Sequence, residues 1–304
     1  MQYLLLLEDE EGYKVCEVDL YNCNNFVVSN EELVEILSGS FLYDEKLIFY
    51  IGNFDTLFKD TTPKLNNYIT SKTDSLGYSF QFIGNADISY FDKTLIINNP
   101  SIDFRILINS QTLIDEKIIF TSNNDNSQYS KTFLTGCVTI YNSKIVNLEF
   151  ESKKSSCEDS LNIISSKGVL KKVNINNSKF DGLDIDFSDI EIETLNVNNI
   201  GNDCSDFSYG SYKILEANLS SCGDKGMSVG EKSKIYVEKL VTESSNIGVA
   251  VKDSSRADIN FFKSTNDSFC ISSYRKKQEF SSAKINISQI VCDSNNIYKQ
   301  KPSD

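Results

Sequence analysis

The sequence predicts an all-β protein: a parallel β-helix with about 22 residues in each coil. The first observation behind this prediction is a five-residue pattern that returns every 22 residues, without a slip, from residue 159 to residue 273. The second is that apolar and polar residues alternate within each repeat, which is the period of a strand and not of a helix. A fixed period of about 20–50 residues indicates a solenoid, in which each coil buries its apolar face only against its neighbours.

The repeated pattern combines one small residue with two apolar ones. Its second position holds only Ser, Gly or Cys, and its third and fifth positions are mostly apolar. The six copies begin at Asp159, Asp181, Asp203, Lys225, Ile247 and Phe269. A second alternating segment follows at the same spacing, at residues 173–175, 195–197 and 217–219. Polar turns separate the strands, and the Leu-x-x-Leu-x-Leu spacing of a leucine-rich repeat is absent, so we expect two or three short strands per coil.

The chain divides into three predicted parts. Residues 1–75 form an N-terminal cap with irregular first strands, including a short helix at 29–39 that Ser29 can begin and Gly39 can end. Residues 76–298 form the β-helix, which is most regular at 159–273. Residues 299–304 form a frayed tail. Further strands are expected at 47–51, 78–83, 94–97, 104–108, 118–120, 138–140 and 283–290.

Composition excludes several classes of protein. The formal net charge is −13, which makes non-specific binding to nucleic acid unfavourable. No apolar stretch approaches about 18 residues, so no membrane span is expected. The apolar residues 3–7 are too short for a signal sequence and lack a basic lead. We therefore expect either a cytoplasmic protein or a piece of a longer exported one.

The eight cysteines show no paired framework. No Cys-x-x-Cys appears, and a chain of 304 residues does not need disulfides to fold. Cys204 and Cys270 occupy the small second position of the pattern, where a thiol packs as a small hydrophobe. We therefore predict free, buried thiols.

The chain contains no histidine. This removes Ser-His-Asp and Cys-His nucleophilic machinery, histidine zinc sites and the ordinary histidine general base. Chemistry would have to come from carboxylates, Lys, Arg, Tyr or a bound hard cation.

Two acidic residues are predicted to stack on the outside of the coils. If the third and fifth positions of the pattern point inward, the fourth position points outward and places Asp184 next to Asp206, about 4.8 Å apart. Stacked carboxylates repel, and three arrangements relieve the repulsion. One acid can stay protonated and form an acid/base couple, a calcium ion can bridge the two, or Lys225 and Lys252 can neutralise them in a surface network. The first two arrangements are functional and the third is structural.

Other side chains flank these two acids. Asp186 lies in the next outward row, Asp203 at a strand entrance, Glu231 beside the same surface, and Arg275 in a basic run that could bind an anionic polymer. We predict these four as substrate-binding residues. Tyrosines near the face could stack on sugar rings, namely Tyr209, Tyr212 and Tyr274.

Residues 130–290 resemble the pectate-lyase-like right-handed parallel β-helix proteins, and more narrowly bacterial β-helix repeat proteins. The most specific part is Gly223-Asp224-Lys225-Gly226 followed by Gly230-Glu231-Lys232-Ser233. The resemblance implies a right-handed β-helix. Lyases of that superfamily pair calcium-binding acids with a Lys or Arg base, and its hydrolases cluster Asp residues as Asp184, Asp186 and Asp206 would be. The chain lacks the hydrolases' Gly-His-Gly element.

These observations lead to one functional hypothesis and one alternative. The hypothesis is a β-helix that binds a carbohydrate polymer, with polysaccharide lyase or hydrolase activity as its catalytic version. A catalytic version would use Asp184 and Asp206, bridged by calcium or a proton, to stabilise a uronate, with Lys225 or Lys252 as the base. The alternative is a non-catalytic structural or adhesin-like scaffold. The sequence names neither the glycan nor the oligomeric state.

Overall fold

The computed structural model describes part of the N-terminal quarter of the chain and most of the rest. The described residues are 3–9, 12–17, 23–24, 42–43, 46–50, 70–73, 79–109, 111–123, 134–293 and 297–299. They contain strands and no helix, so the protein is all-β in every part that the structure describes. The helix predicted at 29–39 lies outside these residues. The chain forms two compact units, Met1–Thr70 with Ser130–Leu134, and Ser71–Tyr129 with Thr135–Asp304.

The first unit contains a five-stranded sheet with the order β3-β2-β1-β5-β4. β1 (Tyr3–Asp9) pairs antiparallel with β2 (Gly12–Glu17) and parallel with β5 (Lys46–Tyr50). The edge strands are β3 (Cys23–Asn24) and β4 (Leu42–Tyr43). The apolar run predicted as a strand at 47–51 is β5.

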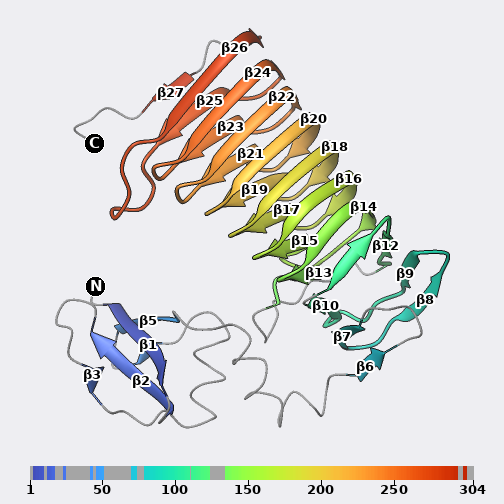
Figure 1. Ribbon diagram of the computed structural model, residues 1–304. Helices are drawn as coiled ribbons and strands as arrows, with labels where there is room; N and C mark the ends of the chain where they lie inside the picture. The colour runs from blue at the N-terminus through green and yellow to red at the C-terminus, as the bar shows by residue number, and fades with distance from the viewer. Residues whose placement is uncertain are drawn as a thin grey trace. The chain divides into compact units, whose positions relative to one another are not determined.

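The second unit is the predicted right-handed parallel β-helix, in which strands of successive coils stack into two sheets (Figure 1). One sheet, the short-strand sheet, contains β6 (Thr70–Thr73), β7 (Ser79–Ile83), β10 (Arg105–Asn109), β13 (Gly136–Tyr141), β15 (Asp159–Ile164), β17 (Asp181–Asp186), β19 (Ser205–Ser208), β21 (Lys225–Gly230), β23 (Ile247–Lys252), β25 (Phe269–Tyr274) and β27 (Ile297–Lys299). The other, the long-strand sheet, contains β8 (Asp87–Phe91), β9 (Thr94–Asn98), β11 (Thr112–Ile114), β12 (Lys117–Thr121), β14 (Lys144–Lys154), β16 (Lys167–Ser178), β18 (Asp189–Ile200), β20 (Ser211–Cys222), β22 (Lys234–Glu243), β24 (Arg256–Thr265) and β26 (Lys284–Cys292).

The 22-residue register read from the sequence is confirmed. The third position of the pattern forms one continuous column of register partners across the short-strand sheet, made of Leu161, Leu183, Ser205, Met227, Val249 and Ile271. The early coils are irregular, as predicted. There β7 pairs antiparallel with β10 and β8 pairs antiparallel with β9, whereas the later strands of both sheets pair parallel.

The long strands bend around the core. In β18 two consecutive residues, Glu193 and Thr194, point away from the core between the buried Ile192 and Leu195. The alternation of inward and outward residues therefore changes phase at this point, which makes a corner and lets one strand cover two sides of the coil. The columns of buried apolar residues on both sides of the corner form one continuous core.

The prediction of free thiols is wrong for the six cysteines whose side chains the structure describes. They form the disulfides Cys137–Cys157, Cys204–Cys222 and Cys270–Cys292. The small second position lies where a coil closes on itself, so residues 18 to 22 positions apart in sequence come within 5.4–6.2 Å at their Cα atoms in Cys204–Cys222 and Cys270–Cys292. Spacing along the chain did not reveal this, because no Cys-x-x-Cys or regular framework marks it. Disulfides of this kind are typical of proteins that fold in oxidising compartments.

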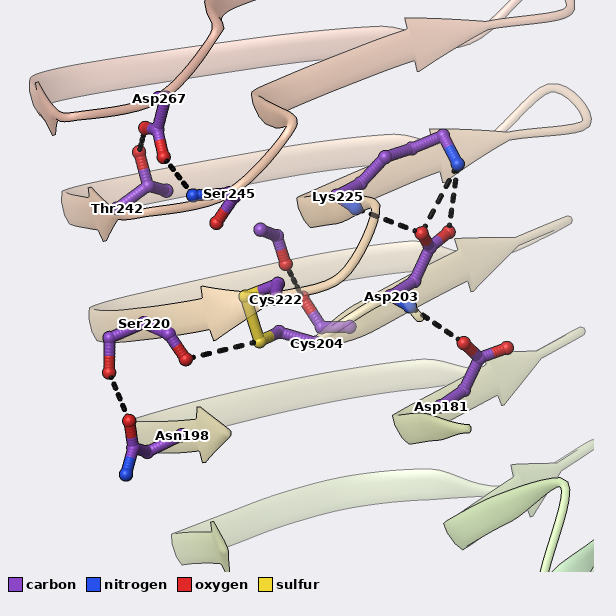
Figure 2. Close-up of a disulfide and its surroundings, with 12 residues drawn as sticks. Asp181, Asn198, Asp203, Cys204, Ser220, Cys222, Lys225, Thr242, Ser245 and Asp267 are labelled. Atoms are coloured by element: carbon purple, nitrogen blue, oxygen red, sulfur yellow. Dashed lines mark hydrogen bonds and ion pairs between the residues drawn. A yellow bond between two sulfur atoms is a disulfide. The ribbon is translucent and has the colours of Figure 1, made fainter. Parts of the chain in front are cut away.

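The corner that holds Cys204–Cys222 is filled differently in a neighbouring coil (Figure 2). There the buried carboxylate of Asp267 accepts hydrogen bonds from the Thr242 hydroxyl at 2.5 Å, the Ser264 hydroxyl at 2.6 Å and the Ser245 amide at 2.7 Å. A buried polar group needs such partners to be tolerated. A disulfide and a fully hydrogen-bonded polar cluster thus fill the same corner in different coils.

Candidate functional site

The outward side of the short-strand sheet, from β15 to β25, carries the acids predicted from the sequence, and we call it the short-strand face. Asp184 of β17 and Asp206 of β19 are register partners, and so are Asp186 and Ser208. The two acids predicted to stack therefore do lie on adjacent strands. Both are partly buried, with the Asp206 side chain 25% exposed.

This face is closed to solvent toward its C-terminal end. In the same outward column, Ser228, Ala250 and Ser272 are all buried. The Ser228 hydroxyl and one oxygen of Asp206 are buried without a hydrogen-bond partner. The open part of the face is thus confined to the coils around β17 and β19.

Lys252 reaches across this closed part to Asp206. Its side chain is buried, and its Nζ lies 3.5 Å from Asp206 Oδ2, two coils away. Gly230 makes room for it, because a Cβ added at Gly230 would lie 2.7 Å from Lys252 Cε. Burial lowers the pKa of Lys252, but Asp206 and Glu231 outweigh that effect and raise it overall. The ammonium is therefore charged at neutral pH.

A second row lies at the strand entrances (Figure 2). Asp181 Oδ1 accepts a hydrogen bond from the Asp203 amide at 2.7 Å, and Asp203 Oδ1 accepts from the Lys225 amide at 3.1 Å. Each acid thus satisfies the first amide of the next coil. The repetition of Asp at the first position of the pattern is the sequence signal of this role.

Lys225 is held by two acids at the end of that row. Its Nζ donates to Asp203 at 3.1 Å and also contacts Asp224. Burial lowers the pKa of Lys225, but Asp203 and Asp224 raise it more, so the net shift is upward. Burial raises the pKa of Asp203 to about 6, although Lys225 acts in the opposite direction. Lys225 is therefore a partner of Asp203 and not an exposed amine.

Three further acids of the face bind protons more tightly than usual. Burial, reinforced by neighbouring carboxylates, raises the pKa of Asp159 to about 7 and that of Asp184 well above its ordinary value. Burial and the adjacent Asp206 raise the pKa of Asp186 to about 7. The face therefore combines two of the predicted arrangements, a carboxyl with a raised pKa and a carboxylate neutralised by lysine.

Two of the four predicted substrate-binding residues are held by other side chains. Asp203 binds Lys225, and the buried Glu231 accepts from the Ser208 hydroxyl at 2.6 Å and pairs with Lys277 at 2.9 Å. Asp186 is partly buried in β17, and Arg275 is exposed in the segment that joins β25 to β26.

An exposed aromatic pair lies beside the open part of the face. The rings of Phe187 and Tyr209, 58% and 41% exposed, are stacked with centroids 4.6 Å apart and planes 5° apart. Phe280 contacts Tyr209 edge-on at 6.3 Å. Tyr209 was singled out from the sequence, whereas Phe187 was missed, although it stands 22 residues earlier at the same turn position. The expectation for Tyr212 is wrong, because its ring is buried and its hydroxyl donates to the Ile185 and Ser208 carbonyls.

The backbone at this pair is unusual. Phe187 and Tyr209 adopt left-handed conformations, with φ of 50° and 51°, which bulky side chains rarely do. In other coils the corresponding left-handed positions hold the polar residues Ser165, Glu231 and Asp253. Exposed aromatic rings on strained backbone are costly for folding alone, so they point to a function.

The predicted calcium site offers two carboxyl groups, those of Asp184 and Asp206. The parts of the chain that the structure describes contain no group of three or more His, Cys, Asp or Glu side chains that could hold a metal ion. Calcium takes six to eight oxygen ligands, and Asp206 already faces the Lys252 ammonium. The arrangement does not favour the predicted calcium ion between Asp184 and Asp206.

No family model, curated protein or solved structure matches the chain. Of the resemblance to pectate-lyase-like proteins, the structure supports the parallel β-helix fold. No helix in the described ranges has the length and apolarity needed to cross a membrane.

Proposed function

We propose that this protein binds a carbohydrate polymer through Phe187, Tyr209 and the partly buried carboxyls beside them, without cleaving it. The observation that carries the proposal is the exposed, stacked aromatic pair on left-handed backbone. The apolar C–H face of a pyranose ring packs on an aromatic ring, whose face is electron-rich.

Phe187 offers a ring face to such a ligand. Tyr209 covers one side of the ring. On the other side, the corresponding turn position of the preceding coil is Ser165, whose side chain is too short to cover it. A sugar ring stacked on Phe187 would therefore extend the row of rings by one coil spacing, about 4.8 Å.

Polar groups for the sugar hydroxyls lie next to the rings. Asp186 directly precedes Phe187, and Ser208 directly precedes Tyr209. With its pKa raised to about 7, the Asp186 carboxyl both donates and accepts hydrogen bonds near neutral pH. A chain with a net charge of −13 repels a polyanion. These features favour a neutral polysaccharide over a uronate polymer.

The ion pairs of Lys225 and Lys252 are consistent with binding without lyase chemistry. A lysine that acts as a general base needs a lowered pKa, whereas Lys225 and Lys252 are both buried in ion pairs that raise it. Neither amine is available to take a proton from a uronate.

Hydrolysis is the second candidate, and one observation favours it. Asp184 has a pKa well above its ordinary value, and Asp206 on the adjacent strand pairs with Lys252. An acid and a carboxylate about 5 Å apart match the spacing in retaining glycosidases. An Asp184→Asn/Asp206→Asn variant tests this: wild-type release of reducing ends that the variant loses would establish hydrolysis. No release by the wild type from any glycan that it binds would remove this candidate.

The binding proposal is tested by retention on a panel of neutral and acidic polysaccharides. We expect the wild type to be retained by a neutral polymer, and the Phe187→Ala/Tyr209→Ala variant to bind at least about tenfold more weakly, since losing two ring contacts of about 1 kcal/mol each corresponds to more than that factor. The matched control is Phe91→Ala/Tyr236→Ala, which removes exposed rings of the long-strand sheet, 81% and 41% exposed.

Two results would contradict the proposal. If the aromatic-pair variant and the control bound alike, the ligand would not use this face. If the wild type bound no polysaccharide of the panel, the non-catalytic scaffold would be the better explanation.

A further inference from the structure

The C-terminal end of the β-helix presents an unpaired strand. β26 is the last strand of the long-strand sheet, and its only neighbour among the described strands is β24. No described strand pairs with its other edge, whose backbone N–H and C=O groups are a template for another strand.

Among the described residues, no strand covers the apolar side chains of β26. Ile287 and Ile290 are register partners of Ile259 and Phe262, both of which are fully buried one coil earlier. Ile290 is nevertheless 45% exposed, because no described strand stacks on β26 beyond it. Val291, 52% exposed, adds an apolar side chain on the outer surface. A strand paired with β26 would cover these side chains.

β26 also lacks the charges that usually protect an edge. Lys284 is its one charged residue, whereas the preceding strand β24 carries Arg256, Asp258 and Lys263. Edge strands of soluble proteins normally carry charges that prevent pairing with another chain. The sequence of β26 is instead that of a strand with a partner.

We propose that β26 pairs antiparallel with β26 of a second copy of this chain, so that two β-helices join end to end. The pairing with Ser288 opposite Gln289 of the other copy places Ile287 opposite Ile290, and both are on the core side. The corner of β26 lies between Ile287 and Ile290. This register therefore keeps the inward-pointing residues of both copies on the same side of the paired strands.

The same register also pairs opposite charges. Lys284 falls opposite Asp293 of the other copy, at both ends of the paired strands, and both side chains are exposed. Opposite charges directly across an antiparallel pair stabilise it, and like charges destabilise it. Because the contact is the same on both copies, it closes after two chains and does not propagate into a fibre.

Sedimentation of the full-length chain over a range of concentrations tests this proposal. We expect a reversible dimer that the Ile290→Lys variant abolishes. The matched control is Ile114→Lys, a residue with 48% exposure on β11, which should leave the dimer intact. Circular dichroism confirms folding of both variants, and folding should persist because both side chains are already exposed.

Charge reversal tests the register. Lys284→Asp or Asp293→Lys alone creates two like-charge contacts and should raise the dimer dissociation constant by about tenfold. The double variant Lys284→Asp/Asp293→Lys should restore wild-type dimerisation. A monomer at every concentration, a concentration-dependent series of larger species, a dimer that survives Ile290→Lys, or a failure of the double variant to restore pairing would each overturn the proposal.

Discussion

The two faces of the β-helix use the same strand alternation but treat charge in opposite ways. On the outer side of the long-strand sheet, the long-strand face, acids and lysines of neighbouring coils pair in water. These pairs are Glu149–Lys171 at 2.7 Å, Glu191–Lys213 at 3.1 Å and Glu216–Lys239 at 2.7 Å. On the short-strand face, acids stack on acids, and the lysines that neutralise them are buried.

We interpret this difference as a division of roles between the two faces. Opposite charges one coil apart neutralise each other at little cost, and such exposed pairs contribute little to stability. Stacking Asp184 on Asp206 and burying Lys252 is costly unless every charge is matched. The short-strand face keeps this arrangement beside an exposed aromatic pair and is therefore specialised. The long-strand face is an ordinary solvent-exposed surface.

The largest expected loss of stability comes from removing a disulfide that links the two sheets. Cys204–Cys222 joins the start of β19 to the end of β20. Replacing both cysteines by serine should lower the free energy of unfolding by about 3 kcal/mol, because the unfolded chain regains the freedom of an 18-residue loop. Denaturant unfolding measures this.

The matched change is made at Cys270–Cys292, which joins β25 to the exposed strand β26. It should cost less, because that end of the stack is open and already less well packed. Equal costs at the two sites, or no cost at Cys204–Cys222, would contradict this expectation.

The next effect comes from removing a buried charge of the short-strand face. Lys252→Met leaves Asp206 without its ammonium partner and should cost about 2 kcal/mol, less than the 3–5 typical of fully buried pairs because Asp206 is partly exposed. Adding Asp206→Asn should recover part of the loss. Chemical denaturation measures both, and a cost for Lys252→Met below 0.5 kcal/mol, estimated as typical of exposed pairs, would be inconsistent with a buried ion pair.

A further effect should appear with pH. The folded-state pKa values of Asp159 and Asp186 are about 7, above the ordinary 3.8, so the folded protein holds more protons between these values. The free energy of unfolding should therefore fall as pH rises from about 4 through 7, and the melting temperature should fall with it.

Thermal melts of Asp159→Asn/Asp186→Asn should lose part of this pH dependence, because the raised pKa values of Asp184 and Asp203 remain. The control Asp189→Asn, at an exposed position of β18, should keep it. Identical pH profiles for wild type and the double variant would show that these acids are not the source.

The smallest effect is expected on the long-strand face. A double-mutant cycle on Glu191 and Lys213 should give a coupling energy of about 0.3 kcal/mol, because both side chains are largely solvated. A coupling above about 1 kcal/mol would mean that the two faces do not differ as described.

The sequence predicted the fold because the period is a property of the chain alone. Positions 161, 183 and 205 fall into one column whatever the loops do, so the coils, the register and the adjacency of Asp184 and Asp206 could be predicted. The disulfides and the burial of Lys252 could not. They depend on where a coil closes on itself, and on the absence of a side chain at Gly230, which only the folded backbone reveals.

The aromatic pair could be predicted from the sequence only in part. Phe187 and Tyr209 are visible as a 22-residue repeat, but their exposure depends on the left-handed turn that holds them. A repeat position that is polar in other coils and aromatic in two neighbouring ones is the signal that would have found them.

Titration of individual carboxyl groups by NMR tests the difference between the two faces most directly. We expect Asp159 and Asp186 to titrate near pH 7, and Glu149 and Glu216 of the long-strand face to titrate below their ordinary values because of Lys171 and Lys239. If the acids of both faces titrated alike, near their ordinary values, the short-strand face would be another solvent-exposed surface and its assignment as the binding face would lose its electrostatic basis.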